Sequence, residues 1–332
     1  MDTLLRRRLM MSVGESPTPP GPGPGPEPPT PTGENIVFAD AVVGQICAEN
    51  WGDGTNITDV QAAAVTNSQF GTTFAGNTSI VSFDEFGTYF TSITAIAGGT
   101  TGNRAFEGCS NLESITIPSS VTSIGNFAFT GCSSLESFVV PSTVTSKGQA
   151  MFQGCTGLKT LTINGSVNSN SITNTSGHCG DGTGKLTIDG SIDHNSSGIH
   201  YFDFKEINIS GDVTKSGSGN NVLLASNYVE KIVIGGNVNR NYNLCSSTGA
   251  EFLELGGTYN SMMLGASTPT TCVVHLKYNG VAGTPSNLRI ARVAKVYVDS
   301  QAILDQYLAD TDWAGYSSKL DLWENYNGVY KD

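Results

Sequence analysis

The amino-acid sequence predicts a β-rich repeat solenoid, in which short parallel strands stack along one axis. Three observations predict this fold. Glycine makes up 40 of the 332 residues and only 14% of the residues are charged, a composition that suits short strands and many turns and excludes a helical bundle, a coiled coil and a membrane-spanning protein. A 23-residue block recurs in three consecutive copies. A series of short apolar segments then follows at similar intervals.

The repeated block is defined by a phenylalanine, a cysteine and a leucine. The three copies place them at Phe106, Cys109 and Leu112, at Phe129, Cys132 and Leu135, and at Phe152, Cys155 and Leu158. Each leucine opens an L-x-x-[ILF]-x-[IV] segment, and this spacing at a period of about 20–29 residues is typical of a leucine-rich-repeat solenoid. One coil cannot bury its apolar side chains alone, so neighbouring coils must stack on it.

The phrase A-F-x-G-C-x-x-L-x-x-[IF]-x-[IV]-P, read over residues 105–163, resembles the BspA-like family of leucine-rich repeats. That family occurs on bacterial surface proteins and in phage proteins. The resemblance implies a solenoid and adhesion, without naming a receptor. It also implies that the repeated cysteines are small core hydrophobes with free thiols, and the odd total of seven cysteines likewise argues against a disulfide framework.

Beyond residue 163 the Phe-Gly-Cys half of the repeat disappears, but the strand half continues. Six further segments are Leu186–Ile188, Ile207–Ile209, Ile232–Ile234, Leu253–Leu255, Val274–Leu276 and Val296–Val298. With the three earlier copies they predict nine coils, spaced at about 4.8 Å per strand. We therefore assign the solenoid to residues 93–298.

The flanking segments are expected to close the two ends of the solenoid. Residues 299–332 are expected to form a helical C-terminal cap, with Ile303, Leu304 and Tyr307 on one helix face and large apolar groups from Trp313 to Trp323 over the open end.

Residues 35–92 are expected to form a small N-terminal module. In relatives the stretch after the tryptophan often resembles half of an EF-hand. Here the loop with Asp53, Asn56 and Asp59 is shortened, and Gln61 stands where a glutamate would ligate calcium. We therefore expect no metal ion and no cofactor.

The N-terminus combines a basic segment over residues 1–11 with a Pro/Gly-rich linker over residues 12–34. The apolar stretch after the arginines is shorter than the about 7–15 residues of a signal-peptide core. No later segment reaches the about 18–20 apolar residues of a membrane helix. The linker is either a plain tether or a polyproline-II spacer that holds a docking arm away from the body. The arm residues most suited to docking are Leu4, Leu5, Arg6, Arg7 and Arg8.

No catalytic constellation stands out in the sequence. The four histidines, His178, His194, His200 and His275, lie in unrelated contexts, and neither G-x-S-x-G nor S-x-x-K occurs. Residues 180–185 imitate a phosphate loop but lack its first glycine and its Ser/Thr. His178, Cys179 and Asp181 lie close together in sequence and are interpreted as a polar loop. We expect no enzymatic activity.

Outward-facing strand positions are the remaining candidates for function. They form two columns, one running from Ser114 to Lys295 and the other from Thr116 to Tyr297. Aromatic and ionisable side chains, which are enriched at binding hot spots, gather near the C-terminal end at Phe252, Glu254, His275 and Tyr297. These four are the predicted ligand-binding surface, although an idle solvated face is the alternative.

The sequence therefore predicts a non-enzymatic binding or adhesion protein displayed on a larger assembly. A net charge of −12 excludes nucleic acid as a partner of the body, and no membrane insertion is expected. We expect a phage virion component, made in the host cytoplasm, that docks through residues 1–34 and contacts a bacterial surface glycan or protein through the solenoid. A bacterial cell-surface or secreted BspA-like adhesin is the alternative, and a carbohydrate-active enzyme on a solenoid scaffold is a third interpretation.

Overall fold

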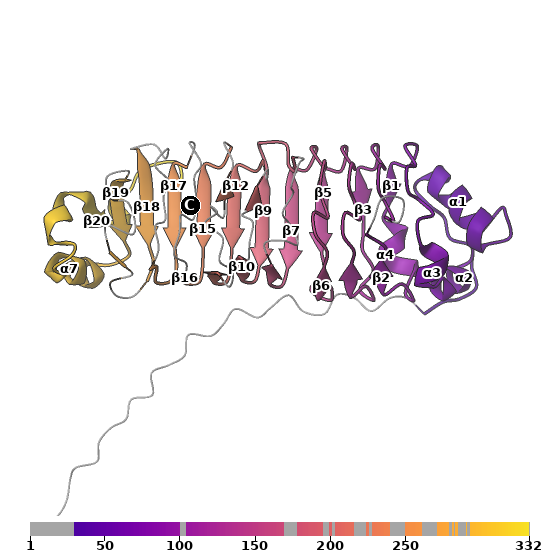
Figure 1. Cartoon of the computed structure of the whole chain (residues 1–332), viewed down its shortest axis with the longest axis horizontal. Coiled ribbons are helices and arrows are strands. Elements are labelled where there is room, and N and C mark those ends of the chain that lie inside the picture. The colour runs from indigo at the N-terminus through magenta and orange to yellow at the C-terminus, as the bar shows by residue number, and fades with distance from the viewer. Residues whose placement is uncertain are drawn as a thin grey trace, which may run out of the picture.

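Parallel strands stack along one axis and form an elongated solenoid with helices at both ends (Figure 1). The computed structural model describes residues 30–99, 104–168, 178–194, 199–200, 203–215, 224–225, 228–239, 250–260, 271–278, 281, 283–284, 290 and 293–331. The predicted fold class, a parallel β-solenoid with short N-terminal helices and a C-terminal helix, is confirmed.

The principal sheet contains nine parallel strands in the described part of the chain. They are β5 (Ser137–Val140), β7 (Thr160–Asn164), β9 (Lys185–Asp189), β12 (Glu206–Ile209), β15 (Lys231–Ile234), β17 (Phe252–Leu255), β18 (Cys272–Leu276), β19 (Val293–Val298) and β20 (Leu320–Leu322). Their register follows the predicted columns, as Ser137 pairs with Thr160 and Thr160 with Lys185. A shift between Cys272 and Val273 interrupts it.

Stacking begins earlier in the chain than residue 93. Strand β1 (Ser82–Phe83) pairs in parallel with β3 (Ser114–Ile115), so the first strand of the repeat lies inside the segment that the sequence assigned to the N-terminal module. At the other end β20 comes from the predicted cap and extends the same sheet.

Shorter parallel strands line the other side of the coils and were not predicted from the sequence. They are β2 (Ala95–Ile96), β4 (Ser123–Ile124), β6 (Ser146–Lys147), β8 (Val167–Asn168), β10 (Ile192–His194), β13 (Val213–Lys215) and β16 (Val238–Asn239). Strands β11 (Ile199–His200) and β14 (Leu224–Ala225) pair with each other in a separate two-stranded sheet. Ile124, Ile192 and Val213 on these strands are fully buried. The apolar core therefore lies between the two lines of strands.

Phenylalanine rings stack from coil to coil through the N-terminal half of the core. The ring centroids of Phe106 and Phe129 lie 5.2 Å apart, and those of Phe129 and Phe152 lie 5.8 Å apart. The angles between neighbouring ring planes are 5° and 14°, so the rings are nearly parallel and the stack runs along the solenoid axis. This geometry explains why phenylalanine recurs at one position of the repeat.

The repeated cysteines form a second buried column. The Sγ atoms of Cys109, Cys132 and Cys155 donate to the carbonyl oxygens of Phe74, Phe106 and Phe129 at 3.1, 3.2 and 3.1 Å. A hydrogen bond with the Cys155 thiol, together with burial, raises the pKa of Cys132 well above its ordinary value. The described cysteines are free thiols, as predicted.

The glycine before each of these cysteines meets a steric requirement of the stack. Gly108, Gly131 and Gly154 have φ values of 74°, 77° and 77°, in the left-handed region that glycine occupies without strain. A Cβ atom on Gly131 would lie 3.6 Å from the Cα atom of Gly108 in the neighbouring coil. The Phe-x-Gly-Cys phrase is thus a left-handed turn that brings adjacent coils close together.

The N-terminal module contains α1 (Ala41–Trp51), α2 (Asp59–Ala64), α3 (Asn67–Phe70) and α4 (Glu85–Tyr89). Its buried rings, among them Phe70 and Phe86 with centroids 4.8 Å apart, close that end of the core. The Asp40 carboxylate caps α1 and also accepts bonds from the amides of Val81 and Ser82. Burial opposes its ionisation, but these backbone bonds outweigh burial and lower the pKa of Asp40.

The residues of the calcium-like loop have structural roles. Asp53 accepts bonds from the Thr55 and Asn56 amides. Asp59 accepts bonds from the amides of Thr32 and Gly33 at 2.6 and 2.7 Å. Thr32 and Gly33, which the sequence assigned to the linker, are therefore tied to the folded module.

The C-terminal cap is built on α7 (Gln301–Ala309), η2 (Ala314–Lys319) and η3 (Trp323–Asn325). Ile303, Tyr307 and Trp313 are buried against the last coil, as predicted. The expectation that Tyr316 and Trp323 cover the open end is wrong, because Tyr316 is 38% exposed and Trp323 lies against His275 on the sheet. Within the described residues, no helix has the length and apolar character needed to cross a bilayer.

Candidate functional site

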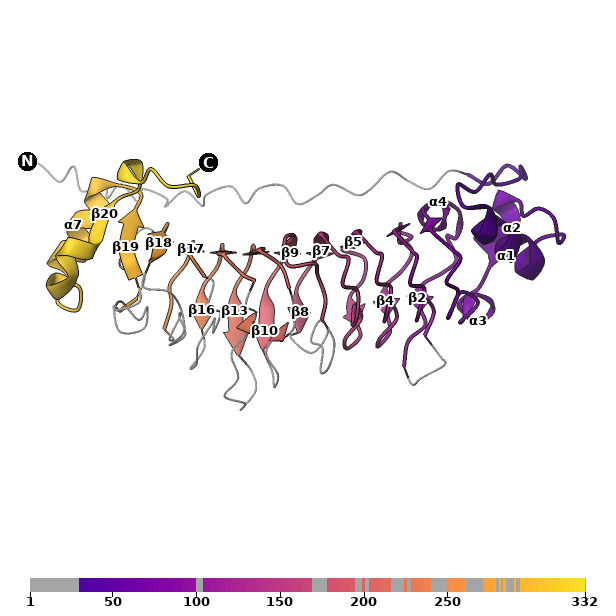
Figure 2. The same cartoon turned by 90° about the horizontal axis from the view of Figure 1, so that it is seen from above.

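The outward side of the principal sheet, here called the outer face, is bounded at both ends by other parts of the chain. Helix α4 lies over one end and the residues after β20 lie over the other, on the same side of the sheet (Figure 2). We call residues 323–331 the C-terminal segment. We call helix α4 and the C-terminal segment the two walls, and we call the part of the outer face between them, formed by successive strands, the floor.

The middle of the floor carries small polar and short apolar side chains. Thr160 and Val139 project outward and are exposed, Val139 to 53%. In the second column Val139 pairs with Thr162, Thr162 with Thr187 and Thr187 with Asn208. Each coil therefore contributes one side chain to a continuous row, as the sequence spacing predicts.

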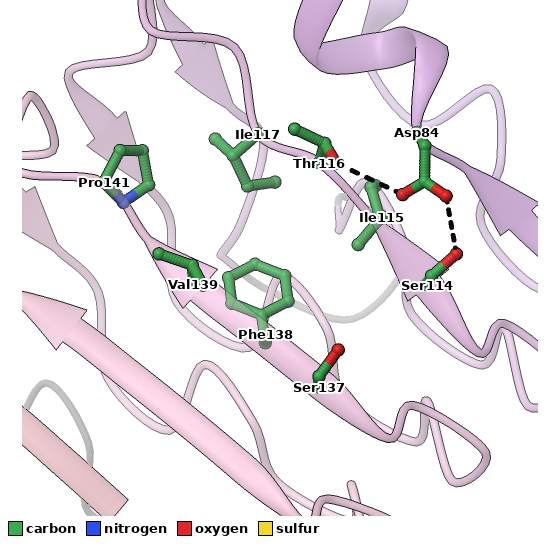
Figure 3. A pocket seen from close by; sticks show the side chains of 9 residues that line it. All are labelled: Asp84, Ser114, Ile115, Thr116, Ile117, Ser137, Phe138, Val139 and Pro141. Atoms are coloured by element: carbon green, nitrogen blue, oxygen red, sulfur yellow. Dashed lines mark hydrogen bonds between the residues drawn. The ribbon is translucent and has the colours of Figure 1, made fainter. Parts of the chain in front are cut away.

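A hollow of about 260 Å³ lies at the N-terminal end of the floor, beside the first wall (Figure 3). Asp84, at the start of α4, accepts bonds from the hydroxyls of Ser114 at 2.9 Å and Thr116 at 3.2 Å. The apolar part of the lining consists of Ile115, Ile117, Phe138, Val139 and Pro141. Helix α4 fits closely here, because a Cβ atom on Gly87 would lie 2.4 Å from Cγ2 of Thr116.

The four residues predicted to bind a ligand lie together at the opposite end of the floor, on β17, β18 and β19. They are not freely exposed, because rings of the C-terminal segment lie on three of them, although Glu254 and His275 also line a hollow of about 340 Å³. The Tyr330 ring stacks on Phe252 with centroids 4.9 Å apart, and the Trp323 ring stacks on His275 at 3.8 Å. Phe252 and His275 are consequently 1% and 2% exposed.

Tyr297 is also covered, since the Tyr326 ring meets it edge-on at 5.2 Å. The C-terminal segment thus uses three aromatic rings to cover the outward columns of β17, β18 and β19. The predicted ligand-binding residues therefore lie beneath the C-terminal segment, and their role in ligand binding stays a prediction.

His275 lies between two carboxylates beneath this segment. Its Nδ1 lies 3.1 Å from Glu254 Oε2, and its Nε2 lies 2.7 Å from Asp299 Oδ1. Each ring nitrogen of His275 therefore faces a carboxylate oxygen at hydrogen-bond distance. Burial opposes ionisation of Glu254, but its bond to His275 and the charge of Lys277 outweigh burial and lower its pKa.

A second hollow, of about 410 Å³, opens in front of the C-terminal segment and is here called the basic pocket. Its lining consists of Lys159, Thr160, Thr183, Gly184, Lys185, Lys205, Glu206, Glu230, Lys231, Val329 and Tyr330. Lys185 and Lys231 approach the same acid, Glu206, at 3.0 and 3.8 Å. Burial opposes ionisation of Glu206, but the two lysines and Asn208 outweigh it and lower the pKa.

Lys185 and Lys231 lie in the outward column that runs from Ser114 to Lys295, but they were not among the predicted ligand-binding residues. The available signal was the recurrence of lysine at one column position in an acidic chain. The contribution of Val329 and Tyr330 had no such signal, because these residues follow the last repeat.

His178 and Asp181, which lie close together in sequence, bond to different partners in the structure. His178 Nδ1 lies 2.5 Å from Asp203 Oδ2 in the next coil, and Asp181 instead accepts bonds from the amides of Thr183 and Gly184. Among the described residues, no group of three or more His, Cys, Asp or Glu side chains could hold a metal ion. The arm residues Leu4, Leu5, Arg6, Arg7 and Arg8 lie outside the described residues.

Comparison with protein families finds one match over part of the chain. Residues 81–183 match the BspA type leucine rich repeat region in six copies. The match begins beside β1 and ends before β9, so it covers the coils with the phenylalanine and cysteine columns. A search of curated proteins finds no match.

Proposed function

Because residues 81–183 are a BspA-type leucine-rich-repeat region, we propose that this chain is a non-enzymatic binding protein. Its partner lies on the outer face, between α4 and the C-terminal segment. The observation that carries the proposal is the floor itself, a row of in-register, partly exposed side chains such as Val139, Thr160 and Thr162. Solenoids of this type offer extended surfaces for recognition.

The finer proposal concerns where the protein acts. Residues 1–34 attach it to a larger assembly, a phage virion, and the solenoid projects to meet a glycan or protein of a bacterial surface. The basic segment and the Pro/Gly-rich linker support this proposal, because such a linker is an extended spacer. Detection of the protein in purified particles by mass spectrometry tests it, and its absence from them would reject it.

A bacterial cell-surface adhesin is the second candidate, and the BspA-type repeat favours it, because this repeat resembles those of bacterial surface proteins. Genomic neighbours distinguish the two. Capsid and tail genes beside this one support the virion proposal, whereas an operon of surface proteins supports the adhesin.

Removal of residues 1–29 is expected to leave the folded body intact and to abolish attachment to the assembly. The deletion stops before Thr32 and Gly33, since these two residues bond to Asp59. Circular dichroism and the melting temperature check the fold, and co-sedimentation with the particle or cell checks attachment. Retained attachment of the shortened protein would contradict the docking role of the arm.

Replacement of Thr162 with arginine is expected to lower binding to bacterial cells at least about tenfold, which corresponds to about 1.4 kcal/mol. A long charged side chain at the centre of the floor blocks close approach of a partner. The matched control is Thr145→Arg, an exposed threonine beside β6 on the other line of strands. Flow cytometry with labelled protein measures both variants, and equal binding by the two would show that the outer face is not the binding surface.

A further inference from the structure

We infer that the basic pocket binds an acidic glycan, a polysaccharide whose sugar units carry carboxylate or phosphate groups. This inference rests on the proposed binding function and names the chemistry of the ligand at one place on the outer face. Three observations support it: the positive charge of the pocket lining, the apolar residues Val329 and Tyr330 at its edge, and a second cavity that shares part of this lining.

The charge of the pocket is opposite to that of the protein. The lining contains four lysines and two glutamates, although the whole chain has a net charge of −12. The side chains of Lys159, Lys185 and Lys205 are 54%, 46% and 52% exposed. Those of Glu206, Glu230 and Lys231 are 27%, 37% and 19% exposed. Three of the four lysine side chains are thus more accessible to an incoming anion than either glutamate of the lining.

The lysines are distributed along the solenoid axis. Lys159 precedes β7, Lys185 begins β9, and Lys231 begins β15, with β12 between the last two. Adjacent strands are about 4.8 Å apart, so these positive charges recur in a row along the floor. A row of charges matches a polymer with an anionic group on successive units better than it matches a single small ion.

The apolar wall consists of Val329 and Tyr330. Val329 is 87% exposed and presents its apolar side chain at the edge of the pocket. Tyr330 is held by its stack on Phe252 and by donation of its hydroxyl to Glu251 at 3.0 Å. A fixed aromatic ring offers an electron-rich face on which the C–H face of a sugar ring packs.

The hollow continues into a second cavity that shares part of its lining. This cavity of about 340 Å³ shares Lys185, Glu206, Lys231 and Tyr330 with the basic pocket and adds Asn208, Val233, Glu254, His275, Lys277 and Trp323. Both volumes fall in the range of about 300–1,000 Å³ that holds small ligands. The ring of Tyr330 therefore contributes to two adjoining subsites, an arrangement suited to consecutive sugar units.

The test measures binding of the full chain by biolayer interferometry to four immobilised polymers. Polygalacturonate presents carboxylates, phosphomannan presents phosphates, dextran is a neutral glycan, and poly-glutamate is an acidic peptide. We expect binding to one or both acidic glycans that weakens as salt is raised, and no binding to dextran. The two acidic arms distinguish carboxylate from phosphate recognition.

Two variants test the named residues. The double substitution Lys185→Ala, Lys231→Ala is expected to raise the Kd for the acidic glycan at least about tenfold, and Tyr330→Ala is expected to raise it several-fold. The matched control is Lys295→Ala. Lys295 follows in the same outward column and pairs with Asp321 at 3.2 Å, but lies outside the basic pocket. Melting temperatures confirm that each variant is folded.

An unchanged Kd in the double variant would overturn the inference, as would the absence of binding to both acidic glycans. The inference would also be overturned if poly-glutamate bound as tightly as the acidic glycan and Tyr330→Ala did not change that binding. The ligand would then be an acidic peptide. These failures are separate from failure of the proposed function. If Thr162→Arg lowers cell binding while the lysine variant does not, the outer face binds a partner without an acidic glycan in this pocket.

Discussion

Replacement of Phe129 with alanine is expected to lower the free energy of unfolding by about 3–5 kcal/mol. The Phe129 side chain is fully buried, and its ring stacks between those of Phe106 and Phe152 and meets Phe138 edge-on at 4.7 Å. Its removal opens a cavity at the centre of the phenylalanine stack. Each coil is stabilised by its neighbours, so the loss weakens the interfaces on both sides.

Chemical denaturation followed by circular dichroism measures this effect. The matched control is Phe127→Ala in the same coil, because Phe127 is half-buried and its ring contacts the Arg104 guanidinium at 4.4 Å. A cation–π contact contributes about 0.5–2 kcal/mol, from exposed to desolvated sites, so the control should lose less stability. Comparable losses in the two variants would show that the phenylalanine stack does not dominate the stability of this coil.

Replacement of Trp313 with alanine is expected to cost a similar amount, about 3–5 kcal/mol, but at the other end of the molecule. Trp313 is fully buried, its ring meets Tyr307 edge-on at 5.0 Å, and its Nε1 donates to the Gly283 carbonyl at 2.7 Å. Loss of this side chain separates the cap from the last coil. Trp313→Phe keeps most of the apolar volume and is expected to cost about 1–3 kcal/mol through the lost hydrogen bond.

Hydrogen exchange locates the damage. In the Trp313→Ala variant the amides of β18 and β19 are expected to exchange faster, while those of β5 and β7 stay protected. Tyr316→Ala is the control, because Tyr316 lies in the same cap but is 38% exposed. Uniformly faster exchange along the solenoid would contradict a local capping role for Trp313.

The strands and their register could be predicted from the sequence because each coil repeats the same local chemistry. Alternation of buried and outward residues over segments such as Phe138 to Val140 identifies a strand, and the interval between coils aligns one strand with the next. Strand β20 could not be predicted in this way. Leu320 and Leu322 follow a helix and have no repeat context, so their pairing with β19 depends on tertiary contacts.

The same reasoning explains what could be predicted of the candidate site. Phe252, Glu254, His275 and Tyr297 come together because they occupy neighbouring positions in the two columns. Their covering could not be predicted, since contacts such as that between Tyr330 and Glu251 join residues 79 positions apart. The basic pocket depends on the same long-range fold-back, which no local pattern marks.

The nearest-neighbour stacking of the coils also determines how the molecule responds to force. A load applied between the two ends acts along the direction of the hydrogen bonds that join successive strands, so the coil interfaces bear it in series. The weakest terminal interface yields first and the others follow one coil at a time. A coil of 21–25 residues, the interval between successive strands, releases roughly 75–90 Å of chain when extended. Under load, the solenoid is therefore expected to unfold and lengthen in steps of one coil.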